Sequence, residues 1–352
     1  MSDEWSRKTD HLELCISGDV GFRRTNLFEQ VGLIHNSLPE LSLDDIDLST
    51  SLAGHRCRAP LMIASMTGGT LEAGSVNRQL AEVAEAGGYA IGLGSQRPMV
   101  KQGRLDREIG KSFVMRDVAP SVPIFGNIGA VQAKASSTEL LEEMVQFVGA
   151  NGLFIHLNPA QEMIQPEGDR DFRGCLEAIE RLTHELSVPV IVKETGCGLS
   201  CSVAQRLAEI GVQHIDVSGA GGTSWVGVET KRAQGQQKES GELFWDWGIP
   251  TAAALLQTRP GRFKTVIATG GMSTGLDAAR AIALGAHGVG MARPVLQALS
   301  RGGIAGALAY LKQTEHDLRV SMLLTGSGNL SALRKTQVRL GPELASWTPT
   351  KD

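Results

Sequence analysis

The sequence has few aromatic residues and no long run of apolar residues. Phe, Trp and Tyr make up 5% of the 352 residues, and only two are Tyr and five are Trp, which leaves little material for stacking nucleic-acid bases. The charge is nearly balanced, with 34 Lys plus Arg against 38 Asp plus Glu and a net charge of −4, so a strongly basic binding face is missing. No apolar run approaches the roughly 20 residues of a membrane span. These absences predict a protein that acts neither on nucleic acid nor inside a membrane.

The sequence also lacks a disulfide framework. Its five cysteines are odd in number and scattered, and reduced thiols are the ordinary state in such a chain. Cys197 and Cys201 stand four apart, but no second pair completes a zinc-site spacing. Residues 1–8 contain no apolar stretch of the kind found in a signal peptide. We therefore expect a cytoplasmic protein.

Hydrophobic residues, by contrast, make up 42% of the chain, and many of them fall in short, continuous apolar runs. Parallel strands that are buried on both faces have this pattern, whereas half-exposed strands alternate. An open doubly wound sheet would need a Gly-rich phosphate-binding turn after an early strand, and none is present. Eight such runs predict a (β/α)8 TIM barrel. The runs are 61–64, 89–93, 123–126, 152–156, 189–193, 214–217, 265–269 and 288–291.

Between the apolar runs lie stretches whose apolar residues recur with helical period. The predicted helices are 76–86, 138–148, 176–186, 203–210 and 276–284.

The barrel interpretation divides the chain into two parts. Residues 1–59 form a polar N-terminal extension, and residues 60–352 form the barrel. A loop insertion at about 219–247 follows the sixth strand, at the end of a barrel where loops carry function. Residues 303–325 are predicted to form a closing C-terminal helix, and the last dozen or so residues a loose tail.

Polar residues follow the first four predicted strands. Ser65-Met-Thr-Gly-Gly69 and Gly94-Ser-Gln-Arg97 come after strands one and two, and an arginine in such a turn suits an oxyanion. Asn127 follows strand three and offers an amide. His156-Leu-Asn-Pro-Ala-Gln-Glu162 follows strand four, and Glu162 could hold Mg²⁺ together with substrate phosphate oxygens. The same carboxylate could instead serve a helix N-terminus, and the residue alone does not decide between the two.

Lys193 ends the fifth strand, where a lysine beside apolar residues is costly unless it meets an anion. It could form a Schiff base with a carbonyl or place its charge beside an anionic ring. Asp216 and Ser218 follow strand six. Gly270-Gly-Met-Ser-Thr-Gly275 and Gly290-Met-Ala-Arg293 follow strands seven and eight, where many barrels bind a phosphate at a helix N-terminus.

These motifs, in this order, resemble type 2 isopentenyl diphosphate isomerase, the FMN-dependent family. The resemblance spans nearly the whole chain. It is carried by seven motifs, which are Arg7-Lys8 with His11, Met66-Thr-Gly-Gly, Gly94-Ser-Gln-Arg97, His156-Leu-Asn-x-x-Gln-Glu162, Val192-Lys-Glu194, Asp216-Val-Ser-Gly-x-Gly-Gly-Thr223 and Gly270-Gly271.

The resemblance implies a (β/α)8 barrel that interconverts isopentenyl and dimethylallyl diphosphate without net redox change. It also implies FMN, Mg²⁺, a reductant such as NADPH, and a homotetramer or homo-octamer. The FMN contacts that it implies are Ser65, Met66, Thr67, Ser95, Asn127, Lys193, Ser218, Thr223, Gly270, Gly271, Ala292 and Arg293. The implied substrate contacts are Arg7, Lys8, Ser95, Gln96, Arg97 and Gln161, with His156 close by and Glu162 on Mg²⁺.

The expected reaction adds a proton at one carbon and removes one at another. No Asp/Glu pair or Cys among the motifs demands the acid–base role, so we expect the reduced flavin to fill it. Gln161 would then orient the substrate, with His156 beside it, and Lys193 would stabilise the anionic flavin.

The main alternative is an FMN-dependent α-hydroxy-acid oxidoreductase on the same barrel. That chemistry needs a histidine base beside an arginine, and the Gly-rich loop Ser218-Gly-Ala-Gly-Gly-Thr223 contains no histidine.

Overall fold

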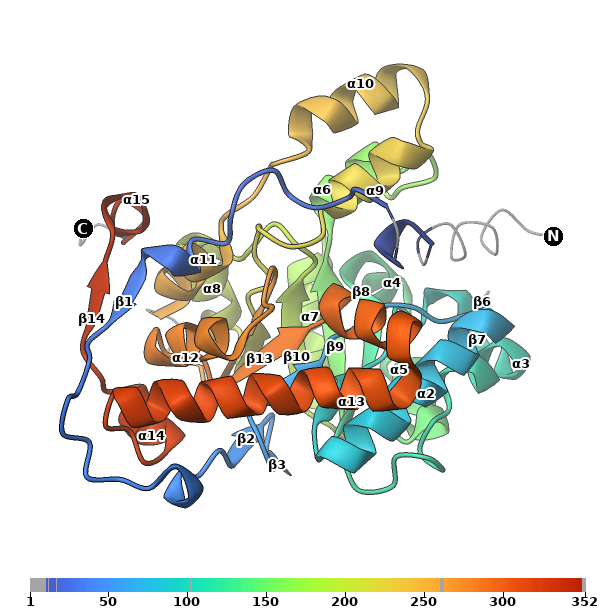
Figure 1. Cartoon of the computed structure of the whole chain (residues 1–352). Coiled ribbons are helices and arrows are strands. Elements are labelled where there is room, and N and C mark those ends of the chain that lie inside the picture. The colour runs from blue at the N-terminus through green and yellow to red at the C-terminus, as the bar shows by residue number, and fades with distance from the viewer. Residues whose placement is uncertain (1–10, 12, 17, 102, 260–262, 350–352) are drawn as a thin grey trace.

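A closed barrel of eight parallel strands forms the centre of the protein (Figure 1). The computed structural model describes residues 11, 13–16, 18–101, 103–259 and 263–349. Each barrel strand overlaps one of the eight apolar runs, so the predicted (β/α)8 barrel is confirmed. In barrel order the strands are β4 (Leu61–Ile63), β5 (Ala90–Gly92), β8 (Ile124–Gly129), β9 (Gly152–Leu157), β10 (Val190–Glu194), β11 (His214–Asp216), β12 (Thr265–Thr269) and β13 (Gly288–Met291).

Helices connect successive strands and surround the barrel. Two of the five predicted helical stretches lie within an observed helix, and the other three extend one residue beyond its C-terminal end. The long C-terminal helix α13 (Arg293–Leu324) starts ten residues before the predicted position and is kinked at Gly302 and Gly303. Gly303 has a positive φ of 59°, so the helical pattern read from the sequence begins at the kink. The other helices are α2 (Leu71–Gly87), α3 (Arg107–Gly110), α4 (Ala130–Ala135), α5 (Thr138–Val148), α6 (Pro159–Ile164), α7 (Cys175–Glu185), α8 (Cys201–Glu209), α9 (Trp225–Arg232), α10 (Gly235–Phe244), α11 (Thr251–Thr258), α12 (Gly275–Ala283), α14 (Leu330–Leu333) and α15 (Pro342–Ala345).

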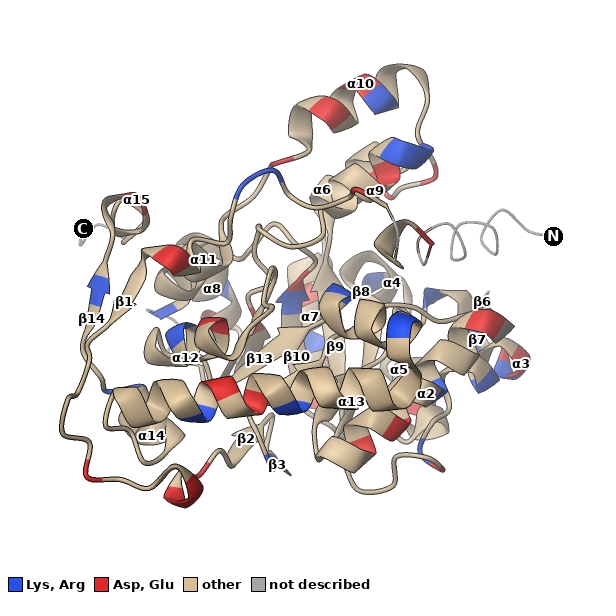
Figure 2. Cartoon of the chain, in the orientation of Figure 1, with Lys and Arg blue, Asp and Glu red and all other residues tan. Residues whose placement is uncertain are grey.

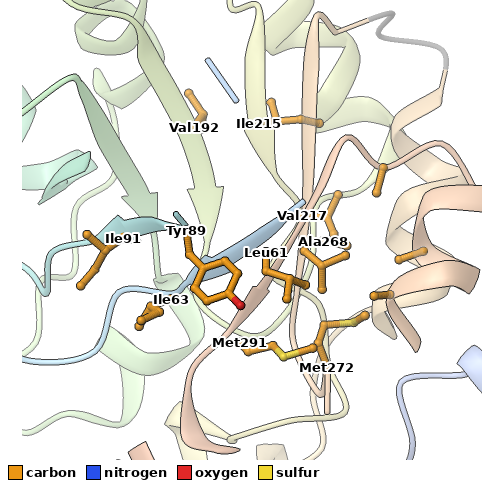
Figure 3. Close-up of a cluster of buried hydrophobic side chains, with 14 of the residues drawn as sticks. Leu61, Ile63, Tyr89, Ile91, Val192, Ile215, Val217, Ala268, Met272 and Met291 are labelled. Atoms are coloured by element: carbon orange, nitrogen blue, oxygen red, sulfur yellow. The ribbon is translucent and has the colours of Figure 1, made fainter. Parts of the chain in front are cut away.

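Alternate residues of the barrel strands fill two separate hydrophobic layers, because successive side chains of a strand point to opposite faces. One set packs outward against the helices and includes Leu61, Ile63 and Met291 (Figure 3). The other set fills the barrel interior, where Phe125 and Phe154 meet edge to face at 5.5 Å between ring centroids. Most strands are therefore apolar on both faces along much of their length, which explains the continuous runs in the sequence.

A short hairpin from the N-terminal extension closes one end of the barrel. Its strands are β2 (Thr50–Leu52) and β3 (His55–Cys57), and Figure 1 shows it on the side of the barrel opposite α9 and α10. Leu52 belongs to the interior cluster, and the amide of Ala53 donates to Thr265 Oγ1 at 3.2 Å. The extension therefore completes the barrel core.

Replacing Leu52, the hairpin residue that fills this end of the barrel, with a smaller residue should destabilise the whole protein. Leu52 is fully buried, so Leu52→Ala is expected to lower the free energy of unfolding by about 2–5 kcal/mol through lost burial and a residual cavity. Urea unfolding followed by circular dichroism measures the loss. Ser51→Ala, on the exposed side of the same strand, should change the free energy of unfolding by no more than about 0.5 kcal/mol. Equal effects of the two substitutions would contradict the role of Leu52 in filling the end of the barrel.

The C-terminal segment is packed against the barrel, so the predicted loose tail is wrong for the described residues up to 349. Strand β14 (Val338–Leu340) pairs antiparallel with β1 (Val31–Leu33). Leu344 in α15 is fully buried, and Gln257 Nε2 donates to the carbonyl of Trp347 at 2.5 Å. The predicted insertion at 219–247 is likewise ordered and contains helices α9 and α10. A further pair of two-residue strands, β6 (Val100–Lys101) and β7 (Arg104–Leu105), lies after β5.

Charged residues of both signs are interspersed over the helices that face the viewer in Figure 2. Among the described residues, no helix combines the length and the low charge that crossing a membrane requires.

Candidate functional site

A cavity of about 390 Å³ opens at the carboxyl ends of the barrel strands. Parallel strands bring their carboxyl ends to one rim, so residues that are far apart in sequence meet there. Fifteen of the residues singled out in the sequence line this cavity. They are Ser65, Met66, Ser95, Arg97, Asn127, His156, Gln161, Glu162, Lys193, Ser218, Thr223, Gly270, Gly271, Ala292 and Arg293.

The remaining predicted site residues lie elsewhere. Thr67 lines a small neighbouring cavity. Gln96 is fully buried beneath the rim, where its Oε1 accepts from the amide of Asn127 at 2.8 Å and its Nε2 contacts Met99 Sδ at 3.3 Å. This arrangement makes Gln96 a support for the third strand tip and not part of the cavity wall. Arg7 and Lys8 lie outside the described residues.

Lys193 is held on the cavity wall between two acidic residues. It pairs in strand register with Asp216 on β11, and its Nζ donates to the carbonyl of Glu194. Burial lowers the pKa of Lys193, and the charges of Asp216 and Glu194 oppose that shift. Burial raises the pKa of Asp216, and the lysine charge opposes it. The pair therefore places a buried cation where an anionic ring could meet it.

Gly270 and Gly271, at the end of β12, allow two loops to meet without side chains between them. Both have positive φ, at 110° and 72°. A Cβ on Gly270 would come within 2.1 Å of the carbonyl oxygen of Gly219, and one on Gly271 within 2.6 Å of that of Gly221. Only glycine fits at these two positions, and the cavity wall there is bare backbone.

The two helices beside this wall differ in how their N-termini are capped. The N-terminus of α12 is closed by a capping box, in which Thr274 Oγ1 accepts from the amide of Asp277 while the Asp277 carboxylate accepts from the amide of Thr274. Helix α13 begins at Arg293, and in the described part of the chain its N-cap residue, Ala292, provides no side-chain cap. An anionic group would meet repulsion at α12 and free amides at α13. The sequence predicted that the turn before α12 takes part in the phosphate site. Because the Asp277 carboxylate caps α12, the structure favours Gly270, Gly271 and the start of α13 for this role instead.

Two hydroxyls near the cavity have no protein partner. Among the described residues, Ser65 Oγ and Thr67 Oγ1 are buried and make no hydrogen bond. Buried hydroxyls normally find a partner, so a polar ligand between β4 and Lys193 would satisfy an unmet requirement. Ser218, on the same rim, has a positive φ of 38°, a strained conformation of the kind that clusters at functional sites. These features fit a large planar ligand with polar edges.

Glu162 stands at the outer part of the cavity within a network of polar groups. Its Oε1 accepts from Asn158 Nδ2 at 2.9 Å, and its Oε2 accepts from the amide of Asp169 at 2.7 Å. Arg97 Nη1 lies 3.9 Å from Glu162 Oε1 and 3.6 Å from Asp169 Oδ2. An ionised Glu162 could hold a divalent cation here, and Arg97 could turn to a phosphate. Among the described residues, no group of three or more His, Cys, Asp or Glu could hold a metal ion alone, so a cation would need ligand oxygens from the substrate.

Glu229 is a site residue that the sequence did not reveal. It lies on α9 within the insertion and is fully buried. Its carboxylate accepts from Gln161 Nε2 at 3.0 Å and from Arg232 Nη1 at 2.8 Å, and His11 Nε2 lies 3.0 Å from its Oε1. Burial alone would raise its pKa, but the bonds from His11 and Gln161 and the charge of Arg232 set that pKa at about 2. Its only sequence signal is a carboxylate inside the otherwise uncharged stretch 225–230.

His156 and Arg293 are already engaged by the protein. His156 Nδ1 lies 2.9 Å from Asn127 Oδ1, and because a side-chain carbonyl can only accept, the imidazole proton sits on Nδ1. Arg293 Nε donates to the carbonyl of Cys15 at 3.0 Å, and its Nη2 donates to that of Gly18. Arg293 thereby ties the N-terminal segment across the mouth of the cavity.

Comparisons with known proteins agree on both fold and family. The model of the FMN-dependent dehydrogenase family matches residues 141–340. The isopentenyl-diphosphate delta-isomerase of Methanothermobacter thermautotrophicus is 42% identical over 341 residues, which cover 97% of this chain and 95% of that protein. The enzyme of the same name from Methanococcoides burtonii is 45% identical over 334 residues, covering 93% and 90%.

A solved structure of a mandelate oxidase variant with an FMN adduct superposes with a TM-score of 0.63 at 17% identity, covering 94% of this chain and 95% of that one. At this identity the likeness concerns the fold. The near full-length identity to the isomerases carries the assignment, and the chain belongs to the isopentenyl-diphosphate delta-isomerase family, built on the FMN-dependent dehydrogenase barrel.

Proposed function

We propose that this protein interconverts isopentenyl and dimethylallyl diphosphate with reduced FMN and Mg²⁺. The observation that carries the proposal is that Lys193, Gln161, Arg97 and Glu162 open onto one cavity. This cavity therefore brings together groups suited to an anionic ring and groups suited to a diphosphate. The test is conversion of isopentenyl diphosphate by purified protein supplied with FMN, Mg²⁺ and NADPH. Omission of FMN should abolish conversion.

The inner half of the cavity has the features that FMN requires. Bare backbone at Gly270 and Gly271 and the uncapped start of α13 would take the phosphate. The unpartnered Ser65 hydroxyl and the Lys193 ammonium would take polar edges of the ring. The remaining contacts proposed from the family are Met66, Thr67, Ser95, Asn127, Ser218, Thr223, Ala292 and Arg293. When bound and reduced, FMN would supply the proton donor and acceptor for the allylic shift.

The outer half would bind the diphosphate. Arg97 offers a guanidinium that is paired only at 3.6–3.9 Å with carboxylates, distances at which a phosphate could readily compete. Glu162 would hold Mg²⁺ together with diphosphate oxygens. Ser95 lines the same wall, whereas Arg7 and Lys8, proposed from the family, would approach from outside the described residues. Gln96 would act indirectly, through its bond to Asn127.

Gln161 would orient the reacting carbon skeleton. Its Nε2 is fixed by Glu229, and its Oε1 lies 3.3 Å from Asn158 Nδ2, so the amide has one defined orientation. Through Gln161, the ionised Glu229 would place a negative charge near the substrate without itself accepting a proton, since its pKa is about 2. His156, oriented by Asn127, would border the same space.

A net oxidation of an α-hydroxy acid fits the site less well. That reaction needs a histidine base next to the hydroxyl carbon. The loop 218–223 supplies no histidine.

Glu162→Gln should raise the Mg²⁺ requirement. The neutral amide keeps the size of the side chain but loses the charge that attracts a hard cation, so the Mg²⁺ concentration for half-maximal rate should rise about tenfold or more. The measurement is the initial rate against Mg²⁺ concentration in FMN-loaded enzyme. Glu180→Gln, on the exposed side of α7 and outside the cavity, is the matched control. An unchanged Mg²⁺ curve for Glu162→Gln would remove this residue from the metal site.

NADPH as the reductant and a homotetramer or homo-octamer are proposed from family resemblance. Stopped-flow bleaching of FMN by NADPH tests the reductant, and light scattering tests the assembly.

A further inference from the structure

A second cavity, of about 730 Å³, lies at the opposite end of the barrel from the first. Its volume falls within the range of about 300–1,000 Å³ that is typical of small-molecule sites. It is bounded by the amino ends of β11, β12 and β13, by the β2–β3 hairpin, and by the segment that begins α14. The side chains that the argument uses are Lys264, Arg334, His214, His287, Asp47 and Ser331.

The charges around this cavity are mostly of one sign. Lys264 and Arg334 are cations, and His214 and His287 can become cations. Asp47 is the single carboxylate among the lining residues, and it is turned to Ser49, accepting from its amide at 2.8 Å and from its hydroxyl at 2.9 Å. The cavity is therefore basic in an otherwise nearly neutral protein.

Arg334 is the clearest sign of a missing partner. Its side chain is half-buried, and within the described residues its Nη1 is shielded from solvent and makes no hydrogen bond. Burial lowers the pKa of its guanidinium, and no carboxylate offsets that cost. His214 Nδ1 is also shielded and unpartnered in the described part of the chain. Unmet buried donors of this kind normally bind water or an ion.

The two histidines of the cavity, His214 and His287, also indicate an excess of positive charge. His287 Nδ1 accepts from the amide of Val266 at 3.1 Å, so the ring proton sits on Nε2 and can be donated to a ligand. Burial, with the charges of Arg334 and His214, lowers the pKa of His287 to about 4. Burial, with Lys264 and His55, also lowers the pKa of His214.

We propose that this cavity binds a dianionic phosphate or sulfate group, either as a free oxyanion or on a small organic molecule. Arg334 and Lys264 supply the permanent charge, and His214, His287 and Ser331 supply further hydrogen bonds. Arg suits such a group because its guanidinium donates in a fork to two oxygens. The site is separate from the catalytic cavity, so the proposal does not depend on the reaction proposed above.

Binding should tighten as the pH falls. An anion near His214 favours the protonated form of this histidine and raises its pKa, so the complex takes up a proton and gains affinity at lower pH. His287 stays a neutral donor through Nε2, because its Nδ1 accepts from the amide of Val266. The guanidinium of Arg334 keeps its charge as the pH falls, and the Asp47 carboxylate stays ionised because bonds from Ser49 lower its pKa. His55 Nε2 donates to the carbonyl of Asn151 at 2.9 Å, and His55 does not line the cavity.

The test is calorimetric titration of FMN-loaded enzyme with sulfate, whose charge is constant between pH 5.5 and 8, at matched ionic strength. The Arg97→Ala background, without added Mg²⁺, weakens anion binding at the catalytic cavity. In this background we expect one binding event that is tighter at pH 5.5 than at pH 8. Arg334→Gln and, separately, Lys264→Gln should weaken it about tenfold, as expected for loss of a charged hydrogen bond.

Lys335→Gln, an exposed neighbour outside the cavity, is the matched control and should bind as the parent does. Arg334→Gln breaks no hydrogen bond of the described chain, so its thermal unfolding should match that of the parent. Phenyl phosphate forms the second arm: tighter binding than sulfate identifies an organic phosphate as the occupant, and weaker binding identifies a free oxyanion. Absence of binding in both arms, equal affinity in Arg334→Gln, or an affinity that does not rise at pH 5.5 would overturn the proposal.

Discussion

Replacing Lys193 with methionine is expected to cause the largest loss in this protein. The substitution keeps an unbranched side chain but removes the one buried cation of the described cavity wall and leaves Asp216 buried beside it without its counter-charge. FMN affinity should fall at least about tenfold, and the rate with saturating flavin should fall by about 100-fold or more, as for loss of a preorganised electrostatic group. Flavin fluorescence quenching measures the affinity, and the conversion assay measures the rate.

The control for this prediction is Lys238→Met, which removes an exposed lysine from α10 and should leave both quantities unchanged. A second variant separates folding from function. Asp216→Asn combined with Lys193→Met removes both members of the pair, so it should recover stability relative to Lys193→Met without recovering activity. If Lys193→Met binds FMN and turns over normally, the assignment of this residue fails.

Gln161→Ala should give the second-largest effect. Gln161 is held by Glu229 at 3.0 Å and faces the cavity, so its loss removes the group that orients the substrate and links it to an ionised carboxylate. We expect kcat to fall by about 100-fold, the loss typical of a reactant that is no longer held in its reactive orientation. KM should change little, because Arg97 and Glu162 still hold the diphosphate.

Met163→Ala is the matched control, since Met163 lies on the same helix but is 42% exposed. Glu229→Gln provides an independent check. It keeps the hydrogen bond to Gln161 possible but removes the charge, so its kcat should fall while its FMN affinity stays normal. If Gln161→Ala left kcat unchanged while substitution of an Asp or Glu in the cavity abolished activity, side chains and not the flavin would act as acid and base.

The strands and most of the cavity could be predicted because they depend on local sequence. A strand buried on both faces must be apolar throughout, as Leu61–Ile63 and Val190–Val192 are. The polar residue after each run then marks the rim of the barrel. For this reason the sequence alone predicts that Arg97, Glu162 and Lys193 lie together at one rim.

Features that depend on contacts distant in sequence could not be predicted. Glu229 belongs to the site only because α9 folds back over α6, and the tail is ordered only because β14 pairs with β1. Gln96 supports the cavity wall from beneath because tertiary packing places it under the third strand tip, and its motif carries no sign of this. The capping box at Thr274 and Asp277 is visible in the sequence as a Thr with an acid three residues later, but its consequence for phosphate binding required the geometry.

The most direct test of the central claim is the absorbance spectrum of bound FMN during anaerobic turnover. Enzyme whose flavin has been reduced once is mixed with excess isopentenyl diphosphate and Mg²⁺, and product and spectrum are followed together. We predict many product molecules per flavin while the spectrum stays that of reduced FMN. Conversion by oxidised or flavin-free enzyme, or reoxidation of one flavin for each product formed, would contradict the account.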